Sequence, residues 1–327
     1  MRRREFIALF GSAAMWPLAA SAQQPKRARR IGVLIQNAEG DPLAQRHRAI
    51  FEQSLDKLGW TVGKNVVVDY RWNNSGPEQA KAAVTELLSL SPDLILANSI
   101  SAVRAAQQAT RTIPIVFTAV SEPVVQGFVK SLAHPGANIT GFTNLEPSVA
   151  GKWLGLLREV APGVTRVALM MNPGSSPVTQ LFYQAIETAA ANDGIETTLI
   201  KVHDLADIQL ALSGIGGGTG LIVPPDTFLG FHYKEIAEFT IRYKVPAVFA
   251  FRYYTAAGGL LSYGPDVPDQ FQRAAVYVDR IFRGEQPGDL PVQQPTKFEY
   301  VINVRTAKAL GLTVPNSMLV AADEVIE

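Results

Sequence analysis

The chain has 327 residues, of which 47% are hydrophobic and 18% are charged, so it holds enough apolar sequence for one large or two medium cores. Thirty Lys and Arg against 29 Asp and Glu leave a formal net charge of +1, which gives no electrostatic reason to expect nucleic acid as a partner. The absence of Cys excludes thiolate metal sites, iron–sulfur clusters, thiol nucleophiles and a lipid anchor on an N-terminal cysteine. No two of the four His stand at metal-ligand spacing, so we expect neither a metal nor a cofactor.

Residues 1–22 have the pattern of a cleaved export signal. Three arginines at 2–4 precede an apolar run, and Ala-Ser-Ala stands directly before Gln23 as a cleavage site. The apolar run of about 15 residues is shorter than the ~20 that a membrane span needs. The paired arginines resemble a twin-arginine signal, and ordinary secretion stays open. We therefore expect a mature protein in the periplasm that begins near Gln23.

From residue 31 onward, short apolar runs alternate with longer amphipathic ones. The short runs are rich in β-branched residues and mostly continuous, which is typical of parallel strands buried on both faces; they cover 31–35, 66–70, 94–97, 115–120, 167–171, 221–223 and 247–251. The amphipathic runs predict helices over 44–58, 78–90, 102–109, 149–160, 179–191 and 233–243. This alternation predicts an α/β fold with doubly wound parallel sheets.

The chain also repeats itself weakly. Residues 30–36 match 166–172 in pattern, and 113–117 match 245–249 at a similar offset. The repeat predicts two lobes of the same architecture.

The predicted lobes exchange chain segments at three points. We place the crossings at the turn-rich segment 136–142, near 255–259 and at 291–295, with a hinge at Thr140-Gly141 and at 255–259. After the second crossing, the strand 260–264 and the helix 268–283 return to lobe one, and after the third the strand 298–302 and the helix 305–310 return to lobe two. Lobe one is then 31–141 plus 256–290, and lobe two is 142–255 plus 291–327.

Polar and aromatic side chains follow the predicted strands. Ligands of open α/β sheets bind beyond the carboxyl ends of the strands, where helix N-termini offer free N–H groups. We therefore expect a ligand in a cleft between the lobes, in contact with Gln36, Asn98, Ser99, Ser121, Glu122, Asn172, Ser175, Asp226, Tyr253 and Tyr263. Each polar residue also has a simpler explanation, since Ser99 and Asp226 are suitable helix caps and Asn172 begins a turn with Pro-Gly.

Common enzyme motifs are missing from the sequence. It contains no G-x-S-x-G, H-E-x-x-H or G-x-x-x-x-G-K-[ST], and the glycine-rich segment 214–220 precedes a strand, whereas a dinucleotide-binding loop follows one. The alternative is an exported two-lobe hydrolase or isomerase that uses Glu122 and Asp226 as an acid/base pair across the cleft. The ligand-sensing core of a transcription regulator is disfavoured, because a helix-turn-helix would stand where this chain has a signal.

Three segments, together with the signal and the repeat, resemble a known family. Residues 113–117, the segment Ser-Leu-Ala-His-Pro-Gly-Ala-Asn-Ile-Thr-Gly at 131–141 and Leu-Pro-Val-Gln-Gln-Pro-Thr-Lys-Phe-Glu at 290–299 look like those of ABC transporter substrate-binding proteins with the type I periplasmic binding fold. The nearest branch includes binding proteins for tryptophan and related aromatic amino acids. The resemblance implies a monomeric, non-enzymatic receptor that closes on a small solute and delivers it to a membrane permease and its ATPase. Gram-positive relatives are commonly lipid-anchored, so the lack of Cys points to free diffusion in a periplasm.

Within this family the residues at the strand ends suit an amino acid. Asn98, Ser99 and Ser121 can donate to a carboxylate, and Asp226 or Glu122 can accept from an ammonium group. Tyr253 and Tyr263 favour an aromatic or bulky apolar side chain over a sugar. The expected ligand is therefore an amino acid with such a side chain.

Overall fold

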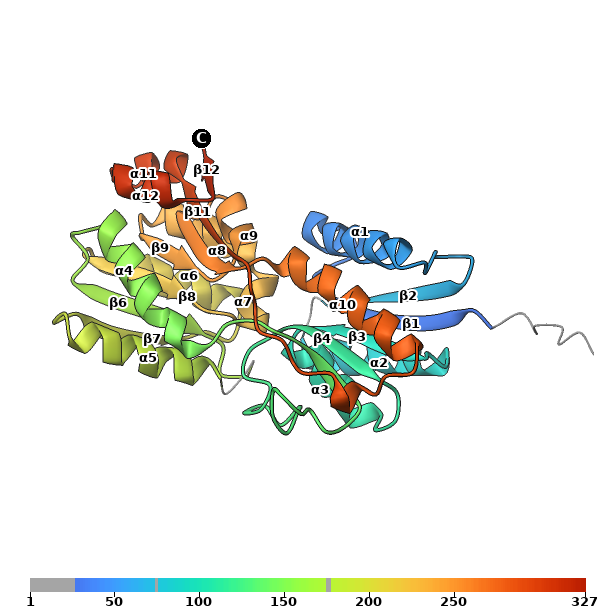
Figure 1. The fold of residues 1–327 in the computed structure, drawn as a ribbon. Coiled ribbons are helices and arrows are strands. Elements are labelled where there is room, and N and C mark those ends of the chain that lie inside the picture. The colour runs from blue at the N-terminus through green and yellow to red at the C-terminus, as the bar shows by residue number, and fades with distance from the viewer. Residues whose placement is uncertain (1–26, 74–75, 175–177) are drawn as a thin grey trace, which may run out of the picture.

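The computed structural model describes residues 27–73, 76–174 and 178–327. The predicted export signal and Ser175 lie outside the described residues. The rest of the chain forms two lobes, each built on its own sheet with helices against it (Figure 1). The predicted fold class, two doubly wound lobes joined by several crossings, is confirmed.

The first lobe has five parallel strands in the order β2-β1-β3-β4-β5. The strands are β1 (Arg29–Gln36), β2 (Val66–Asn73), β3 (Leu94–Asn98), β4 (Ile115–Val120) and β5 (Ile139–Thr143). The helices are α1 (Pro42–Lys57), α2 (Pro77–Ser89), α3 (Ile100–Ala109) and α10 (Val267–Phe282).

The strands of this sheet are covered on both faces. Helices α1 and α10 lie side by side over one face, and α2 and α3 lie on the other (Figure 1). Successive residues of a strand point to opposite faces. Ile35 accordingly packs in the cluster that contains Phe51 of α1, whereas Leu34 packs in the cluster that contains Leu87 of α2. Burial on both faces explains the continuous apolar sequence of these strands.

The second lobe has seven strands in the order β12-β11-β10-β9-β8-β6-β7. They are β6 (Arg166–Met171), β7 (Glu196–Lys201), β8 (Thr219–Val223), β9 (Ala247–Phe249), β10 (Leu261–Pro265), β11 (Phe298–Asn303) and β12 (Glu324–Ile326). Neighbouring strands are parallel except for β10 and β11, which are antiparallel. The helices are α4 (Ala150–Val160), α5 (Thr179–Ala191), α6 (Leu205–Gly214), α7 (Thr227–Phe231), α8 (Tyr233–Arg242), α9 (Arg252–Ala256), α11 (Val304–Ala309) and α12 (Asn316–Ala321). Short 3-10 turns occupy Pro147–Val149 and Pro287–Asp289.

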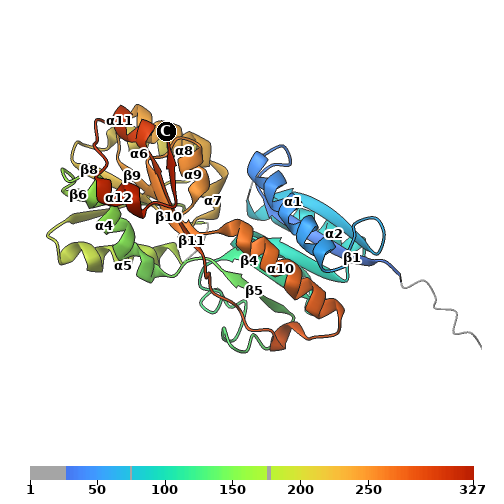
Figure 2. The same ribbon diagram turned by 45° about the horizontal axis from the view of Figure 1, so that its top comes forward.

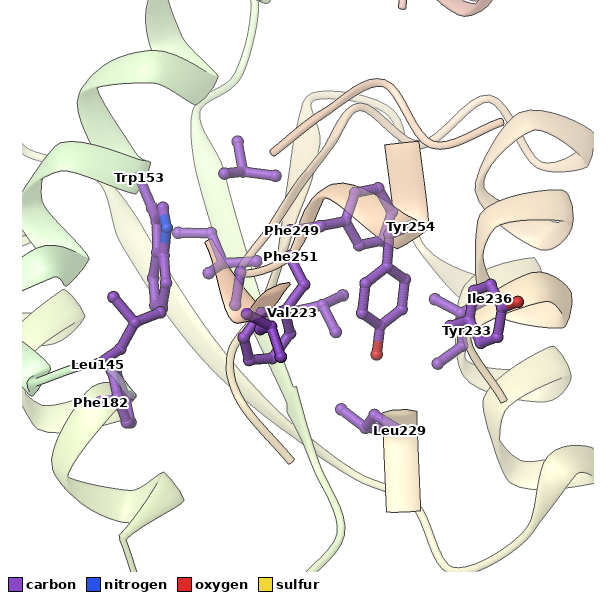
Figure 3. Packing of buried hydrophobic residues seen from close by; sticks show 14 of the residues in the cluster. Leu145, Trp153, Phe182, Val223, Leu229, Tyr233, Ile236, Phe249, Phe251 and Tyr254 are labelled. Atoms are coloured by element: carbon purple, nitrogen blue, oxygen red, sulfur yellow. The ribbon is translucent and has the colours of Figure 1, made fainter. Parts of the chain in front are cut away.

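Aromatic rings fill the core of the second lobe (Figure 3). Trp153 stacks on Phe182 with ring centroids 5.6 Å apart, and Phe249 stacks on Tyr254 at 4.7 Å. The indole Nε1 of Trp153 donates a 2.8 Å hydrogen bond to the backbone oxygen of Tyr263 in β10. This packing fixes α9 and the end of β9 against the sheet. The backbone that carries the side chains facing the first lobe is therefore rigid.

The chain crosses between the lobes after β5, after β10 and after the 3-10 turn Pro287–Asp289 (Figure 2). Two predicted crossings are therefore wrong. Residues 136–142 mostly form β5 rather than a linker, because Gly141 serves a close approach to β4 instead of a turn: a Cβ there would lie 2.3 Å from the oxygen of Phe117. The strand at 260–264 stays in the second sheet, because β10 pairs with β9 and β11, and the chain returns to the first lobe only with α10.

Backbone hydrogen bonds join the three crossings into one ribbon. The N–H of Thr143 donates to the oxygen of Gln293 at 2.8 Å, and the N–H of Asp266 donates to the oxygen of Lys297 at 3.1 Å. The hinge predicted at Thr140-Gly141 and at 255–259 falls inside the lobes, where Thr140 is fully buried in β5 and Thr255 in α9. A rotation between the lobes has to bend this ribbon instead.

Candidate functional site

A cavity lies between the lobes at the carboxyl ends of β1, β3, β4 and β8. Its free volume is about 50 Å³, and we call it the inner chamber. Polar side chains from both lobes make up about half of its lining, namely Gln36, Asn37, Asn98, Ser121, Asn144, Asp226 and Thr227. The position agrees with the general rule that ligands of open α/β sheets bind beyond the carboxyl ends of strands.

A larger and more apolar cavity of about 330 Å³ adjoins the inner chamber, and we call it the outer chamber. The two chambers share the lining residues Leu43, His47, Phe251, Tyr253 and Val267. The outer chamber adds Pro42, Ala256, Ala257, Pro265 and Pro268, together with charged or hydroxyl groups of Arg46, Tyr233, Lys234, Arg252 and Glu299. The site therefore combines a small chamber, in which about half of the lining residues are polar, with a larger and more apolar one, as sites for amphipathic small molecules do.

Besides Arg252 Nε, which lies 3.5 Å from Glu299 Oε1, three buried polar atoms in the chamber walls have no hydrogen-bond partner within the described part of the chain. They are Ser121 Oγ, Asn144 Oδ1 and His47 Nε2, and their residues are 2%, 3% and 5% exposed. Leaving one such group unpaired costs about 1–3 kcal/mol, and most buried polar atoms in proteins are paired. The wall of the inner chamber therefore contains three polar groups that the described residues leave unpaired.

Asn98 ties the ends of three strands together beneath the inner chamber. Its Oδ1 accepts from the N–H of Gln36 at 3.2 Å, and its Nδ2 donates to Thr118 Oγ1 at 3.0 Å. Ser99 lines neither chamber and instead caps α3, where its Oγ accepts from the N–H of Ala102 at 3.4 Å. The structure therefore gives Asn98 a place in the cavity wall and gives Ser99 a capping contact.

Asp226 lines the inner chamber and also holds the local backbone. Its carboxylate accepts from the N–H groups of Phe228 (2.8 Å), Leu229 (3.1 Å) and Asn172 (3.0 Å). Asn172 is a turn residue, since its Nδ2 donates to the oxygen of Val202 at 2.9 Å and its Oδ1 accepts from the N–H of Gly174 at 2.8 Å. The ammonium-binding role of Asp226 stays a prediction, beside a capping role that the hydrogen bonds make plain.

Glu122 and Tyr263 lie away from the two chambers. Burial, and secondarily the nearby Glu146 carboxylate, raises the pKa of Glu122, whose side chain lines neither chamber. Tyr263 stacks on Phe298 with centroids 5.6 Å apart and lines a separate cavity of about 380 Å³ beside the crossings. The two chambers therefore do not bring Glu122 and Asp226 together as the acid/base pair of the enzyme alternative.

An aromatic wall closes the second-lobe side of the chambers. Tyr253 stacks on Phe251 at 5.2 Å and on Tyr254 at 4.9 Å, and Tyr233 meets its edge at 5.1 Å. Burial raises the pKa of Tyr253 far above its ordinary value, so this ring stays neutral at physiological pH. Phe251, Tyr253 and Tyr233 line the outer chamber, so its second-lobe side presents aromatic surface.

The lobes touch each other around the chambers. Gln36 Nε2 of the first lobe donates to the backbone oxygen of Thr227 in the second at 3.2 Å. Asp41, at the start of α1, accepts from the Tyr233 hydroxyl at 3.3 Å and faces Lys234 Nζ at 3.6 Å. The described conformation is therefore one in which the lobes are closed over the cavity.

Two polar residues of the inner chamber were not expected from the sequence, His47 and Asn144. Asn37 and Thr227 also line this chamber, at strand ends where ligand-binding side chains are expected. Asn144 follows β5, which was taken for a linker. His47 sits on a helix face with the spacing of a core residue, and its burial could not be separated from a packing role.

Within residues 27–73, 76–174 and 178–327, no group of three His, Cys, Asp or Glu side chains is arranged to hold a metal ion. The helices in the same ranges are too short or too polar to cross a membrane.

Comparisons with known proteins agree with this architecture. The family model described as "ABC transporter substrate binding protein" matches residues 31–326. The chain is 25% identical over 305 residues to a tyrosine-binding protein of Clostridioides difficile, covering 91% of this chain and 86% of the relative.

Two solved structures have a similar fold. A conserved domain protein from Vibrio cholerae is 29% identical with a TM-score of 0.84, and the match covers 91% of this chain and 100% of that one. An ABC domain in complex with L-Trp from Streptococcus pneumonia is 22% identical with a TM-score of 0.81, covering 91% and 99%. The family model spans nearly all of the described fold, and this chain belongs to the ABC transporter substrate-binding proteins.

Proposed function

We propose that this protein is the solute receptor of an ABC importer and that it takes an aromatic amino acid between its lobes. One observation carries the proposal: buried, unpartnered polar atoms adjoin an apolar chamber of about 330 Å³ with an aromatic wall. The charged head group of an amino acid can pair with the polar atoms, and a large flat side chain can fill the apolar chamber. The relatives named for tyrosine and L-Trp support the same ligand class.

The polar and apolar chambers suggest how the ligand lies. Its carboxylate accepts from the Ser121 hydroxyl, and its ammonium group donates to Asn144 Oδ1, with the Asp226 carboxylate in the same wall. Its side chain extends into the outer chamber against Phe251 and Tyr253. A hexose suits this site less well, because the outer chamber offers mostly apolar surface to its hydroxyl groups.

We further propose that the protein works outside the cytoplasm as a monomer, without changing its solute chemically. Residues 1–22 direct export and are removed before Gln23, so that the mature receptor diffuses in the periplasm and delivers its solute to a permease and an ATPase. The expected result of N-terminal sequencing of the secreted protein is a start near Gln23.

Titration calorimetry of the mature protein tests the ligand class. L-tryptophan or L-tyrosine should bind at one site per chain, and glucose and myo-inositol should give no heat of binding. Ligand recovered after incubation should be chemically unchanged, which separates binding from turnover. Tight binding of a sugar with no response to any aromatic amino acid would leave only the receptor role.

Tyr253→Ala should weaken binding of the aromatic amino acid by about 1–3 kcal/mol, because it removes the ring on which the side chain packs. Tyr263→Ala is the matched control, since it removes the same group from the separate cavity beside the crossings. Both dissociation constants come from calorimetry, with thermal unfolding to confirm that each variant is folded. Equal losses of affinity in the two variants would argue against the outer chamber as the side-chain site.

Asp41→Asn should speed ligand release by about twofold to fivefold, as expected from losing one partly exposed ion pair. The substitution removes the charge that faces Lys234 Nζ, while an Asn still caps α1. Stopped-flow fluorescence measures the release rate. Asp289→Asn makes the same charge change at an exposed position and should release ligand at the wild-type rate. An unchanged rate in Asp41→Asn would mean that this contact does not hold the lobes closed.

A further inference from the structure

His47 is a buried polar residue in the wall that the two chambers share. Its ring stacks on Phe271 of α10 with centroids 4.6 Å apart and an angle of 17°, which fixes the plane of the imidazole. The residue is 5% exposed, and its Nε2 has no hydrogen-bond partner among the described residues. Burial, and secondarily the charge of Arg46, lowers the pKa of His47 to about 3. The imidazole is therefore neutral and carries one donor and one acceptor nitrogen.

The place of His47 sets it apart from the other unpartnered polar atoms. Ser121 and Asn144 line the inner chamber and are absent from the wall of the outer one, whereas His47 lines both. Of the other four residues in the shared wall, Leu43, Phe251 and Val267 have no polar side-chain atom, and Tyr253 has its hydroxyl group. A ligand side chain that leaves the inner chamber must pass this wall. The imidazole thus lies in the wall that the side chain passes, whereas Ser121 and Asn144 line only the inner chamber.

We propose that His47 selects ligands whose large side chain carries an N–H or O–H group, so that the site favours tyrosine or tryptophan over phenylalanine. The inference rests on the proposed function. A phenol hydroxyl or an indole N–H can pair with the imidazole. A phenyl ring cannot, and it leaves the buried nitrogen without a partner. Sites built to hydrogen-bond a substrate group discriminate strongly against the analogue that lacks it.

Calorimetry with L-tyrosine, L-tryptophan and L-phenylalanine tests the proposal on the wild-type mature protein and on His47→Phe. The wild type should bind tyrosine or tryptophan about tenfold or more tightly than phenylalanine, from the cost of one unpaired buried group. His47→Phe keeps a ring to stack on Phe271 and removes the polar nitrogens. It should bring the three affinities to within a few-fold, with phenylalanine bound at least as tightly as before.

A second variant, His47→Gln, is the control for a folding defect. His47→Gln keeps a hydrogen-bonding group in the same wall, and its preference for the polar side chains should exceed that of His47→Phe. The same ratio of affinities in wild type and His47→Phe would overturn the proposal, as would an equal loss for all three ligands, which assigns His47 to the head group. Binding of no amino acid by the wild type would instead overturn the proposed function itself.

Discussion

Asp226→Ala is expected to lower the free energy of unfolding by about 2–4 kcal/mol, the sum of a lost helix cap and one buried N–H left unpaired. The carboxylate caps α7 through the N–H groups of Phe228 and Leu229, and it reaches across to the N–H of Asn172 at the end of β6. Alanine removes all three acceptor contacts from a residue that is 7% exposed. Urea unfolding monitored by circular dichroism measures the change.

Asp226→Asn provides the control for this prediction. Asn keeps an oxygen that caps α7 nearly as well as a carboxylate, so most of the stability should return. An ammonium-binding role would appear separately, as an affinity for the amino acid that falls in Asp226→Asn while the protein stays stable. Wild-type stability in Asp226→Ala would contradict the capping role that the hydrogen bonds assign to it.

Gly230→Ala is expected to weaken ligand binding about twofold to tenfold while leaving the second lobe folded. A Cβ at this position in α7 would lie 2.4 Å from Gln36 Nε2, which belongs to the opposite lobe. The Gln36 side chain would have to move and give up its hydrogen bond to Thr227, a loss of about 0.5–1.5 kcal/mol. Ala has a higher helix propensity than Gly, so the substitution should not destabilise α7. It should instead raise the free energy of the closed arrangement of the lobes.

Calorimetry and small-angle scattering together measure this effect. Gly155→Ala is the matched control, because a Cβ at that position in α4 meets no atom within 4 Å. Gly230→Ala should bind more weakly than Gly155→Ala and should show a smaller change in radius of gyration on adding ligand. Wild-type affinity in Gly230→Ala would show that closure tolerates a methyl group at this contact.

The parallel strands could be predicted from the sequence because each is buried on both faces. The runs at 31–35 and 94–97 lie inside β1 and β3, and the helix predicted over 179–191 is α5. Strand β7 was missed because it is an edge strand with half-exposed residues and no continuous apolar run. Strand β10 was assigned to the wrong lobe for another reason. The sequence of a single strand does not show which other strands it pairs with.

Part of the candidate site could be predicted from the rule that ligands of open α/β sheets bind beyond the carboxyl ends of the strands. That rule identified Gln36, Asn98, Ser121, Asp226 and Tyr253, all of which line the inner chamber. It cannot separate a cap from a ligand contact, and for Ser99 and Asn172 the local hydrogen bonds follow the capping and turn patterns.

His47 shows the other limit of sequence reasoning. The buried residues of α1 are Ala44, His47, Phe51 and Leu55, a spacing that is typical of a helix face packed in a core. Only the stacked Phe271 and the adjoining chambers distinguish its environment from ordinary packing.

A crystal structure of the mature protein grown with L-tyrosine or L-tryptophan would show where the ligand binds. We expect one amino acid between the lobes, with its head group beside Ser121 and Asn144 and its ring against Tyr253 in the outer chamber. An amino acid bound instead in the cavity beside Tyr263 and Phe298, with the two chambers unchanged, would contradict it.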